Sequence, residues 1–424
     1  MDNFHDHSNQ PLRQNIASHL EITLDAASNL LALAVALFAN NTSIKSLKAN
    51  IHQSFMAGTS HSEILFLFEA LGSRPHLQEI VIRDLRRLRS HPNVQAAPLP
   101  IQALSLALIQ ASKLQVLQLS FLTFSGTTSD FTTLGASLQN HPSLQEIDIS
   151  NCCLEAPYRE DDYEAGEAFA MAGEPATQDN NCILDPLIKA LATIQPLKKV
   201  TLNATIQNEM GNMSPASIGF LIGHSTNLQS IDLQGFALTH GHIAAMIPGL
   251  CGTQNDRLSS LKEICLGTIQ LGELGDKSLA QILQSNTTLE YVDLKLDDGD
   301  SSVHVAKALI DNHGSLRHLF IHGNITPISQ QSFAEAMEFN YVLESMELMN
   351  GSAEYLPAIR FYLRMNAIGR RELLMGPTDR SIGNKNAIGA SKSKWVEALI
   401  THRKDSSALF YLLSVNPLLC ADVQ

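Results

Sequence analysis

The chain has 424 residues, of which 44% are hydrophobic and 6% aromatic, and its formal net charge is −13. This hydrophobic content excludes a largely disordered chain, because enough apolar surface is present to bury a core. The negative charge argues against nucleic-acid binding, which requires clustered lysine and arginine. We therefore expect no nucleic-acid partner, and we expect a protein partner to present a basic or neutral surface.

The cysteines, the N-terminal segment and the longest apolar run indicate the cellular compartment of the protein. The six cysteines form neither C-x-x-C pairs nor the Cys/His spacing of zinc sites, so reduced thiols are predicted. Residues 1–15 lack the basic and apolar regions of a secretory signal. The longest apolar run, residues 30–39, is about half as long as a membrane span requires. These features predict a cytoplasmic protein with no membrane contact, and a monomer is expected.

The N-terminal part of the chain is expected to begin with a disordered polar tail, residues 1–19. A first strand, a helix from about Ala27 and a second strand at Ile44–Ala49 should follow. Together they are interpreted as a cap, because the first strand of a repeat array would otherwise present an open edge.

One short phrase, L-x-x-L-x-L, organises residues 20–350. It begins nine times, and the last four starts lie 28, 27 and 27 residues apart. A fixed period of this length on this phrase indicates leucine-rich repeats, in which each repeat forms one strand and one returning helix. We predict an α/β solenoid with a curved parallel sheet inside and helices outside. The phrases start at Leu77, Leu114, Leu144, Leu197, Leu228, Leu261, Leu289, Leu316 and Leu343.

The segments between the phrases carry apolar residues at helical spacing, so helices are expected there. Ser332 and Glu335 match a capping box at the start of one such helix. The largest insertion, residues 155–181, has a net charge of −7. It is interpreted as a mobile acidic loop, with a docking loop for a basic partner as the alternative.

Residues 351–424 are predicted to form a C-terminal helical cap. Its first helix places four arginines on a polar side, with Gly369 as its stop. Four apolar residues of the later helices are expected to seal the last repeat. The arginines are Arg360, Arg364, Arg370 and Arg371, and the apolar residues are Trp395, Leu399, Phe410 and Leu413.

Residues 20–350 resemble the ribonuclease-inhibitor-like leucine-rich-repeat proteins, as seen in FALTHGHIAAMIPGL and GELGDKSLAQILQSNTTL. HPSLQEIDIS and the tail segments YLRMNAIGRRELL, KWVEALI and FYLLSVNPLLC are similar to the uncharacterised leucine-rich-repeat proteins predicted in diatoms and related algae. The resemblance implies a strand-lined intracellular binding surface. It implies no particular activity.

No common nucleotide-binding, hydrolase or metalloprotease motif occurs in the chain, so neither enzymatic activity nor a cofactor is predicted. His240 and His242 fall where a repeat turns from strand into helix, and a structural turn is expected rather than a metal site. Cys152 occupies the repeat position that commonly takes Asn or Cys and points inward.

The concave side of the sheet is the candidate binding surface. Side chains alternate along a strand, so the residue between the last two consensus positions faces away from the core. That column reads Val81, Gln118, Asp148, Thr201, Asp232, Cys265, Asp293, Phe320 and Glu347. Its carboxylates should lie about 10 Å apart on alternate strands and stay ionised. The predicted protein-binding residues are Glu146, Asp148, Asp232, Glu263, Tyr291, Asp293, His318, Phe320, His322 and Glu347.

These observations favour a non-enzymatic interaction scaffold that binds another protein on the acidic concave strands. Two alternatives stay open. The first is an activator of a small GTPase, although the chain lacks the long acidic C-terminal tail of that group. The second is a substrate-recognition subunit of a ubiquitin ligase or a receptor, which would need partner domains that this sequence does not contain.

Overall fold

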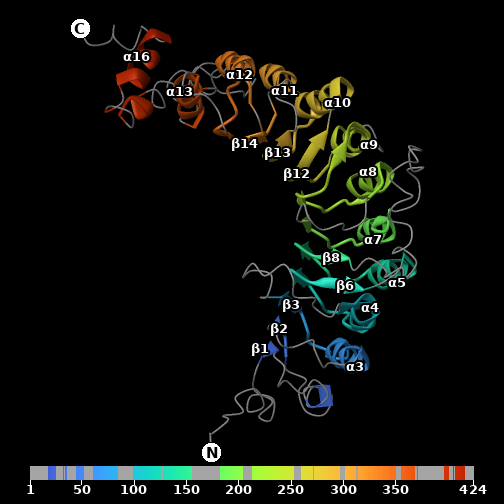
Figure 1. Ribbon diagram of the computed structural model, residues 1–424. Helices are drawn as coiled ribbons and strands as arrows, with labels where there is room; N and C mark the ends of the chain where they lie inside the picture. Colours follow the sequence, from blue (N-terminus) through green and yellow to red (C-terminus); the bar gives the residue numbers. More distant parts are fainter. Residues whose placement is uncertain are drawn as a thin grey trace, which may run out of the picture. The chain divides into compact units, whose positions relative to one another are not determined.

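The computed structural model describes the repeats and parts of the C-terminal region (Figure 1). The acidic insertion at 155–181, residues 1–17 of the predicted tail, Gly369, Arg371 and Trp395 lie outside the described residues. The described residues are 18–24, 32, 34–35, 44–51, 61–84, 99–125, 128–154, 182–203, 213–252, 259–270, 272–296, 301–311, 314–323, 325–349, 355–367, 370, 396–400, 404 and 406–415.

All nine predicted phrases form strands, and each strand starts two residues after the first leucine of its phrase. The two expected N-terminal strands are also present, β1 at His19–Leu24 and β2 at Ser46–Ile51. The nine are β3 (Glu79–Asp84), β5 (Val116–Ser120), β7 (Glu146–Ser150), β9 (Lys199–Asn203), β10 (Ser230–Leu233), β12 (Glu263–Gln270), β13 (Tyr291–Leu296), β14 (His318–Gly323) and β15 (Ser345–Leu348).

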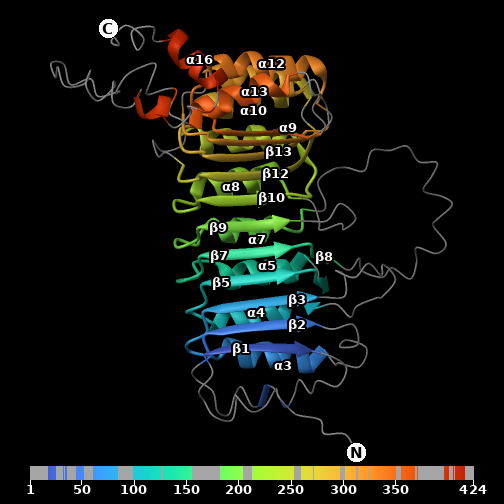
Figure 2. The same ribbon diagram turned by 90° about the vertical axis from the view of Figure 1, so that its left-hand side faces the viewer.

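The chain divides into two compact units, which are residues 1–237, 244–261 and 265–267 (unit 1) and residues 238–243, 262–264 and 268–424 (unit 2). In unit 1 the strands pair in parallel in the order β1-β2-β3-β5-β7-β9-β10, and Figure 2 shows them stacked with the helices behind. Its helices are α3 (His61–Gly72), α4 (Ile101–Gln110), α5 (Thr128–Leu138), α7 (Asp185–Leu191) and α8 (Pro215–His224). A small parallel sheet joins β4 (Leu99–Pro100), β6 (Thr123–Ser125) and β8 (Cys153–Leu154).

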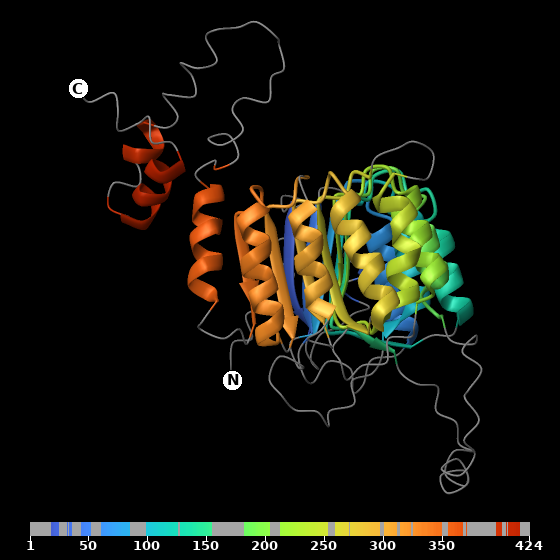
Figure 3. The same ribbon diagram turned by 90° about the horizontal axis from the view of Figure 1, so that it is seen from above.

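Unit 2 repeats the same strand-helix alternation. Its strand order is β12-β13-β14-β15, where β12 contributes residues to both units, and β11 (Leu238–Thr239) pairs with β12. Figure 3 shows its yellow and orange helices side by side. They are α10 (Gly272–Ser285), α11 (Ser301–Asp311), α12 (Pro327–Phe339) and α13 (Leu356–Ala367), while α9 (His240–Leu250) contributes residues to both units and α16 (Ser406–Val415) lies near the C-terminus. The fold is a leucine-rich-repeat solenoid of the α/β class, as predicted.

The core lies between the strands and the helices of each repeat. In β5 and β7, buried and half-buried residues alternate strictly, as expected for strands with one face covered. The consensus positions are closed to solvent: Leu117, Leu119 and Leu294 are each 0% exposed. The residues between them form the open face, which we define as the strand face opposite the helices.

Polar side chains close the turn that precedes several strands. The residue three positions before the first leucine of a phrase accepts hydrogen bonds from the backbone N–H groups two and three positions after itself. Asn286 does so at 2.9 and 2.7 Å, and Asn340 at 3.1 and 2.8 Å. In the repeat that begins at Leu144 a histidine replaces the asparagine, and Nδ1 of His141 accepts at 3.4 and 3.2 Å.

This histidine should make unit 1 sensitive to acid. Burial lowers the pKa of His141 below its ordinary value, and the Ala111 carbonyl offsets only part of that effect. The neutral ring is therefore favoured in the folded state, so its contribution to stability is complete above about pH 6.5 and is lost as pH falls below it. Asparagine keeps a hydrogen-bond acceptor at this position and does not titrate. We therefore expect the melting temperature of His141→Asn to fall less than that of wild type when the pH is lowered from 7.5 to 5. Equal losses in both proteins would contradict this role.

One predicted helix start is wrong. The helix over residues 327–339 starts at Pro327 and not at Ser332, because Thr326 is its N-cap and accepts from the Ser329 N–H at 3.2 Å. Ser332 lies inside the helix and donates to the Ile328 carbonyl at 3.0 Å. A capping-box pattern inside an established helix thus carries no boundary information.

The C-terminal packing also differs from expectation. Phe410 is 75% exposed and Leu413 is half-buried, so neither seals a repeat. The buried cluster is formed by Met365, Ala398, Ala408 and Leu412, with Leu399 packed against it. Arg370, which was assigned to a polar helix side, is only 4% exposed. The boundaries proposed for tail, solenoid and cap stay predictions.

Candidate functional site

The strand register aligns the predicted open-face column within each unit. In unit 1, Val81, Gln118, Asp148, Thr201 and Asp232 are consecutive partners across five strands. In unit 2, Asp293, Phe320 and Glu347 are partners across β13, β14 and β15. The neighbouring row in unit 2 aligns Tyr291 with His318 and Ser345.

The acidic column of unit 1 is interrupted by basic and hydroxyl groups. Asp148 is half-buried and accepts a hydrogen bond from the Ser150 hydroxyl. Burial raises the pKa of Asp148, while Ser150, Lys199 and Arg83 lower it. Glu146 faces Lys199 across β7 and β9. The cations on adjacent rows partly offset these carboxylates, and the acidic character predicted for the whole face stays a prediction.

An aromatic cluster occupies the open face of unit 2. The ring centroids of Tyr291 and Phe320 lie 5.2 Å apart, and those of Tyr291 and His318 lie 6.4 Å apart. All three side chains are half-buried, so one side of the cluster is available to solvent. The sequence predicted each residue as a contact. Their grouping follows from the β13–β14 register, which places Tyr291 directly opposite His318.

Asp293 lies next to this cluster and is not the exposed carboxylate that was predicted. It is 7% exposed, and its Oδ1 lies 3.1 Å from Nε2 of His322. Its register partner on β14 is Phe320, and His322 lies two residues further along the same strand. Asp293 therefore positions His322 and offers little carboxylate surface to a partner.

The remaining predicted contacts are spread over the face. Glu263 and Glu347 are exposed at β12 and β15, and Asp232 is half-buried. The Oδ1 atom of Asp232 accepts a hydrogen bond from the Gln234 N–H at 2.9 Å. Within unit 2 the structure therefore brings together Tyr291, Asp293, His318, Phe320 and His322.

The His240–His242 pair and Cys152 were examined in the sequence as possible sites, and in the fold His242 and Cys152 have structural roles. Nδ1 of His242 lies 3.1 Å from the Thr239 N–H, which donates to it, at the turn from β11 into α9. Cys152 is fully buried, and its Sγ lies 3.4 Å from the Leu119 carbonyl oxygen. Both outcomes match the expected turn and inward positions. Among the described residues, no three His, Cys, Asp or Glu side chains gather as a metal site.

Comparison with known proteins finds similarity in backbone structure alone. No family model and no curated protein matches the chain. It is similar to the structure of an internalin from Listeria monocytogenes, with 15% identity and a TM-score of 0.34 over 80% of this chain and 88% of that one. A TLR13 complex with ssRNA13 has 13% identity and a TM-score of 0.37, over 79% and 40%. Actin-binding site 2 of leiomodin-1 has 14% identity and a TM-score of 0.26, over 37% and 75%.

No helix in the described part of the chain is long and apolar enough to cross a membrane.

Proposed function

We propose that the chain is a non-enzymatic protein-interaction scaffold whose open strand face binds a partner protein. The observation that carries the proposal is the half-exposed cluster of Tyr291, His318 and Phe320 beside the Asp293–His322 contact. Aromatic side chains held rigidly on strands supply large contact area at a low cost in conformational entropy, and such residues dominate binding energy at protein interfaces.

The chemistry of the cluster favours a partner with basic side chains. An arginine placed over the Tyr291 or Phe320 ring would gain a cation–π interaction. Glu347, which is exposed and aligned with Phe320, lies at the edge of the same row and can accept a hydrogen bond from a second basic group. We accordingly infer a basic or neutral protein surface as the partner, bound by a cytoplasmic monomer. The finer likeness to ribonuclease-inhibitor-like and algal repeat proteins is part of this proposal.

The proposal predicts that the aromatic cluster dominates binding. Partners captured from a native lysate with the full chain would be identified by mass spectrometry, and the affinity of the main partner would be measured by titration calorimetry. The double variant Tyr291→Ala/Phe320→Ala should weaken binding at least about 30-fold, since two central aromatic contacts each contribute roughly 1 kcal/mol or more. Glu347→Gln should change affinity little and reduce the salt dependence, because exposed charges act mainly through steering.

The matched control is Phe220→Ala, which removes a 37% exposed aromatic from α8 on the helical side. It should leave the affinity unchanged. Circular dichroism would establish that each variant keeps its fold. If the double variant and the control bind the captured partner equally well, the open face of unit 2 is not the binding surface.

A further inference from the structure

We propose that the edge of β15 that no other described strand covers binds an acidic, extended peptide segment of a partner protein as an additional strand. The site is the groove between β15 and α13, which is separate from the open face. Binding through the aromatic cluster can therefore fail while this proposal holds, and the reverse is also true.

The first argument is the edge itself. Among the described residues, β15 pairs only with β14. The N–H groups of Ser345 and Met349 donate to the carbonyls of Arg317, which precedes β14, and of Ile321 on β14, at 3.0 and 3.1 Å. Because backbone direction alternates along a strand, the N–H and C=O groups of Met346 and Leu348 point to the other edge. An edge of this kind is a template for another strand.

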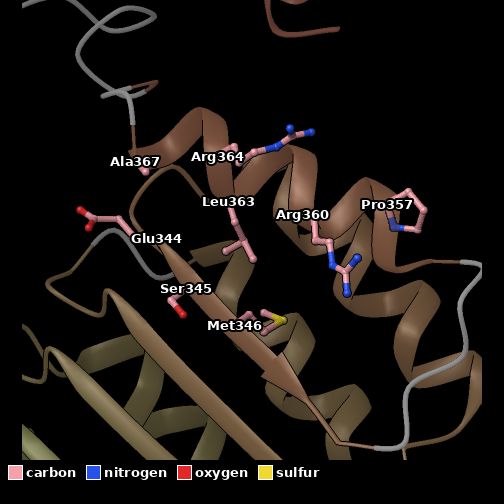
Figure 4. Close-up of a pocket in the computed structure, with 8 residues that line it drawn as sticks. All are labelled: Glu344, Ser345, Met346, Pro357, Arg360, Leu363, Arg364 and Ala367. Atoms are coloured by element: carbon pink, nitrogen blue, oxygen red, sulfur yellow. The ribbon is translucent and has the colours of Figure 1, made fainter. Parts of the chain in front are cut away.

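The second argument is that the edge opens into a real groove. A cavity of about 590 Å³ lies between β15 and α13, which is the size range of ligand sites. Figure 4 shows Leu363 pointing from α13 toward Ser345 and Met346, which supplies an apolar floor. The four residues of β15 span about 13 Å, so a peptide of roughly five or six residues would fit along the strand.

The third argument is charge. Residues 356–367 of α13 contain Arg360 and Arg364 and no acidic residue. Both arginines are exposed, and Figure 4 shows Arg360 reaching down on the side of Met346, whereas the Arg364 side chain points away from the strand. Glu344, the acid among the described lining residues, forms an ion pair with Arg317. Arg360 therefore gives the α13 side of the groove a positive charge on a chain of net charge −13, which selects an acidic segment over a basic one there.

The test uses the full chain and two fluorescein-labelled heptapeptides that alternate valine with either glutamate or lysine. Fluorescence anisotropy should show that the glutamate peptide binds at least about tenfold tighter than the lysine peptide. Arg360→Glu should weaken the affinity for the glutamate peptide at least about tenfold. Lys307→Glu, the same charge change at an exposed position of α11, should change that affinity much less. N-methylation of alternate peptide residues, made in both registers, should abolish binding in the register that faces β15.

Four results would overturn the proposal. The first is equal or absent binding of the two peptides, and the second is an unchanged affinity for Arg360→Glu. The third is full binding by both N-methylated peptides, which would exclude strand pairing. The fourth is a dimer in sedimentation velocity that dissociates in Arg360→Glu, because the natural occupant of the edge would then be a second copy of the chain.

Discussion

Replacement of Leu294 by aspartate is expected to unfold several repeats of unit 2. Leu294 is 0% exposed, and its register partner Ile321 on β14 is equally buried. The substitution removes the apolar contacts of a core leucine and places an unpaired carboxylate among aliphatic side chains. We expect a loss of about 4 kcal/mol or more in the free energy of unfolding, since the cavity and the buried charge each cost several kcal/mol.

The damage should spread from β13 to its neighbours, because stability in a repeat array depends on the interfaces between adjacent repeats. Hydrogen exchange would then show loss of protection in β13 and β14 together. Leu294→Met is the volume-matched control and should cost less than about 1.5 kcal/mol. Lys307→Asp, which introduces the same acid at an exposed position of α11, should be nearly neutral. Unchanged exchange in Leu294→Asp would show that this side chain does not support the core.

The repeat phrase made the strands predictable, because its leucines report both the period and the buried face. Leu117 and Leu119 show the rule, as both are fully buried while the intervening Gln118 is half-buried on the open face. The ends of helices were harder to place. Ser332 and Glu335 satisfy a local cap pattern, but Thr326 followed by Pro327 provides an earlier and stronger start.

The open face shows why a column of residue types does not define a surface. Asp293 and Glu347 occupy the same row, yet one is 7% exposed and the other is exposed. The difference arises from side chains in adjacent rows, and His322 is a diagonal neighbour that no single column contains. A sequence specifies that two acids share a face. Their exposure depends on how neighbouring rotamers pack, which the periodicity does not encode.

Arg370 was misplaced for a related reason. Arg360 and Arg364 lie on an exposed helix side, and extending the helical period assigned Arg370 to the same side. However, α13 ends at Ala367, where Asn366 bonds to the Asn340 and Leu343 carbonyls at 2.9 and 2.8 Å. Arg370 is itself helical but lies beyond this end, so the period of α13 does not fix its direction.

Substitution of Arg370 by methionine is expected to detach the C-terminal helices from the last repeat. The guanidinium donates to the Met337 and Glu338 carbonyls at 3.0 and 2.6 Å, which lie in the last turn of α12. It also donates to the Tyr411 hydroxyl at 2.8 Å. One buried side chain therefore caps α12, where four carbonyls lack intrahelical partners, and holds α16 against it.

Three aromatic rings enclose the same guanidinium. Its Cζ lies 4.6 Å from the ring centroids of Tyr341 and Tyr362 and 5.5 Å from that of Tyr411. Methionine keeps most of the side-chain volume but removes the donors and the cation, so we expect a loss of roughly 3 kcal/mol in the free energy of unfolding. Lysine should restore only part of it, because a point charge cannot reproduce the planar fork of donors.

Two measurements distinguish the loss of these Arg370 contacts from a general loss of stability. Hydrogen exchange should lose protection first in residues 406–415, while β13 and β14 keep theirs. Burial, and then the nearby Glu338 carboxylate, raise the pKa of Tyr362, whereas Arg370 lowers it. Removing the cation while the ring stays packed should therefore raise that pKa further in an ultraviolet titration. Arg360→Met, which removes an exposed guanidinium from α13, is the control and should change neither signal. If Arg370→Met behaves like this control, the C-terminal helices are held by apolar contacts of Met365 and Leu412 alone.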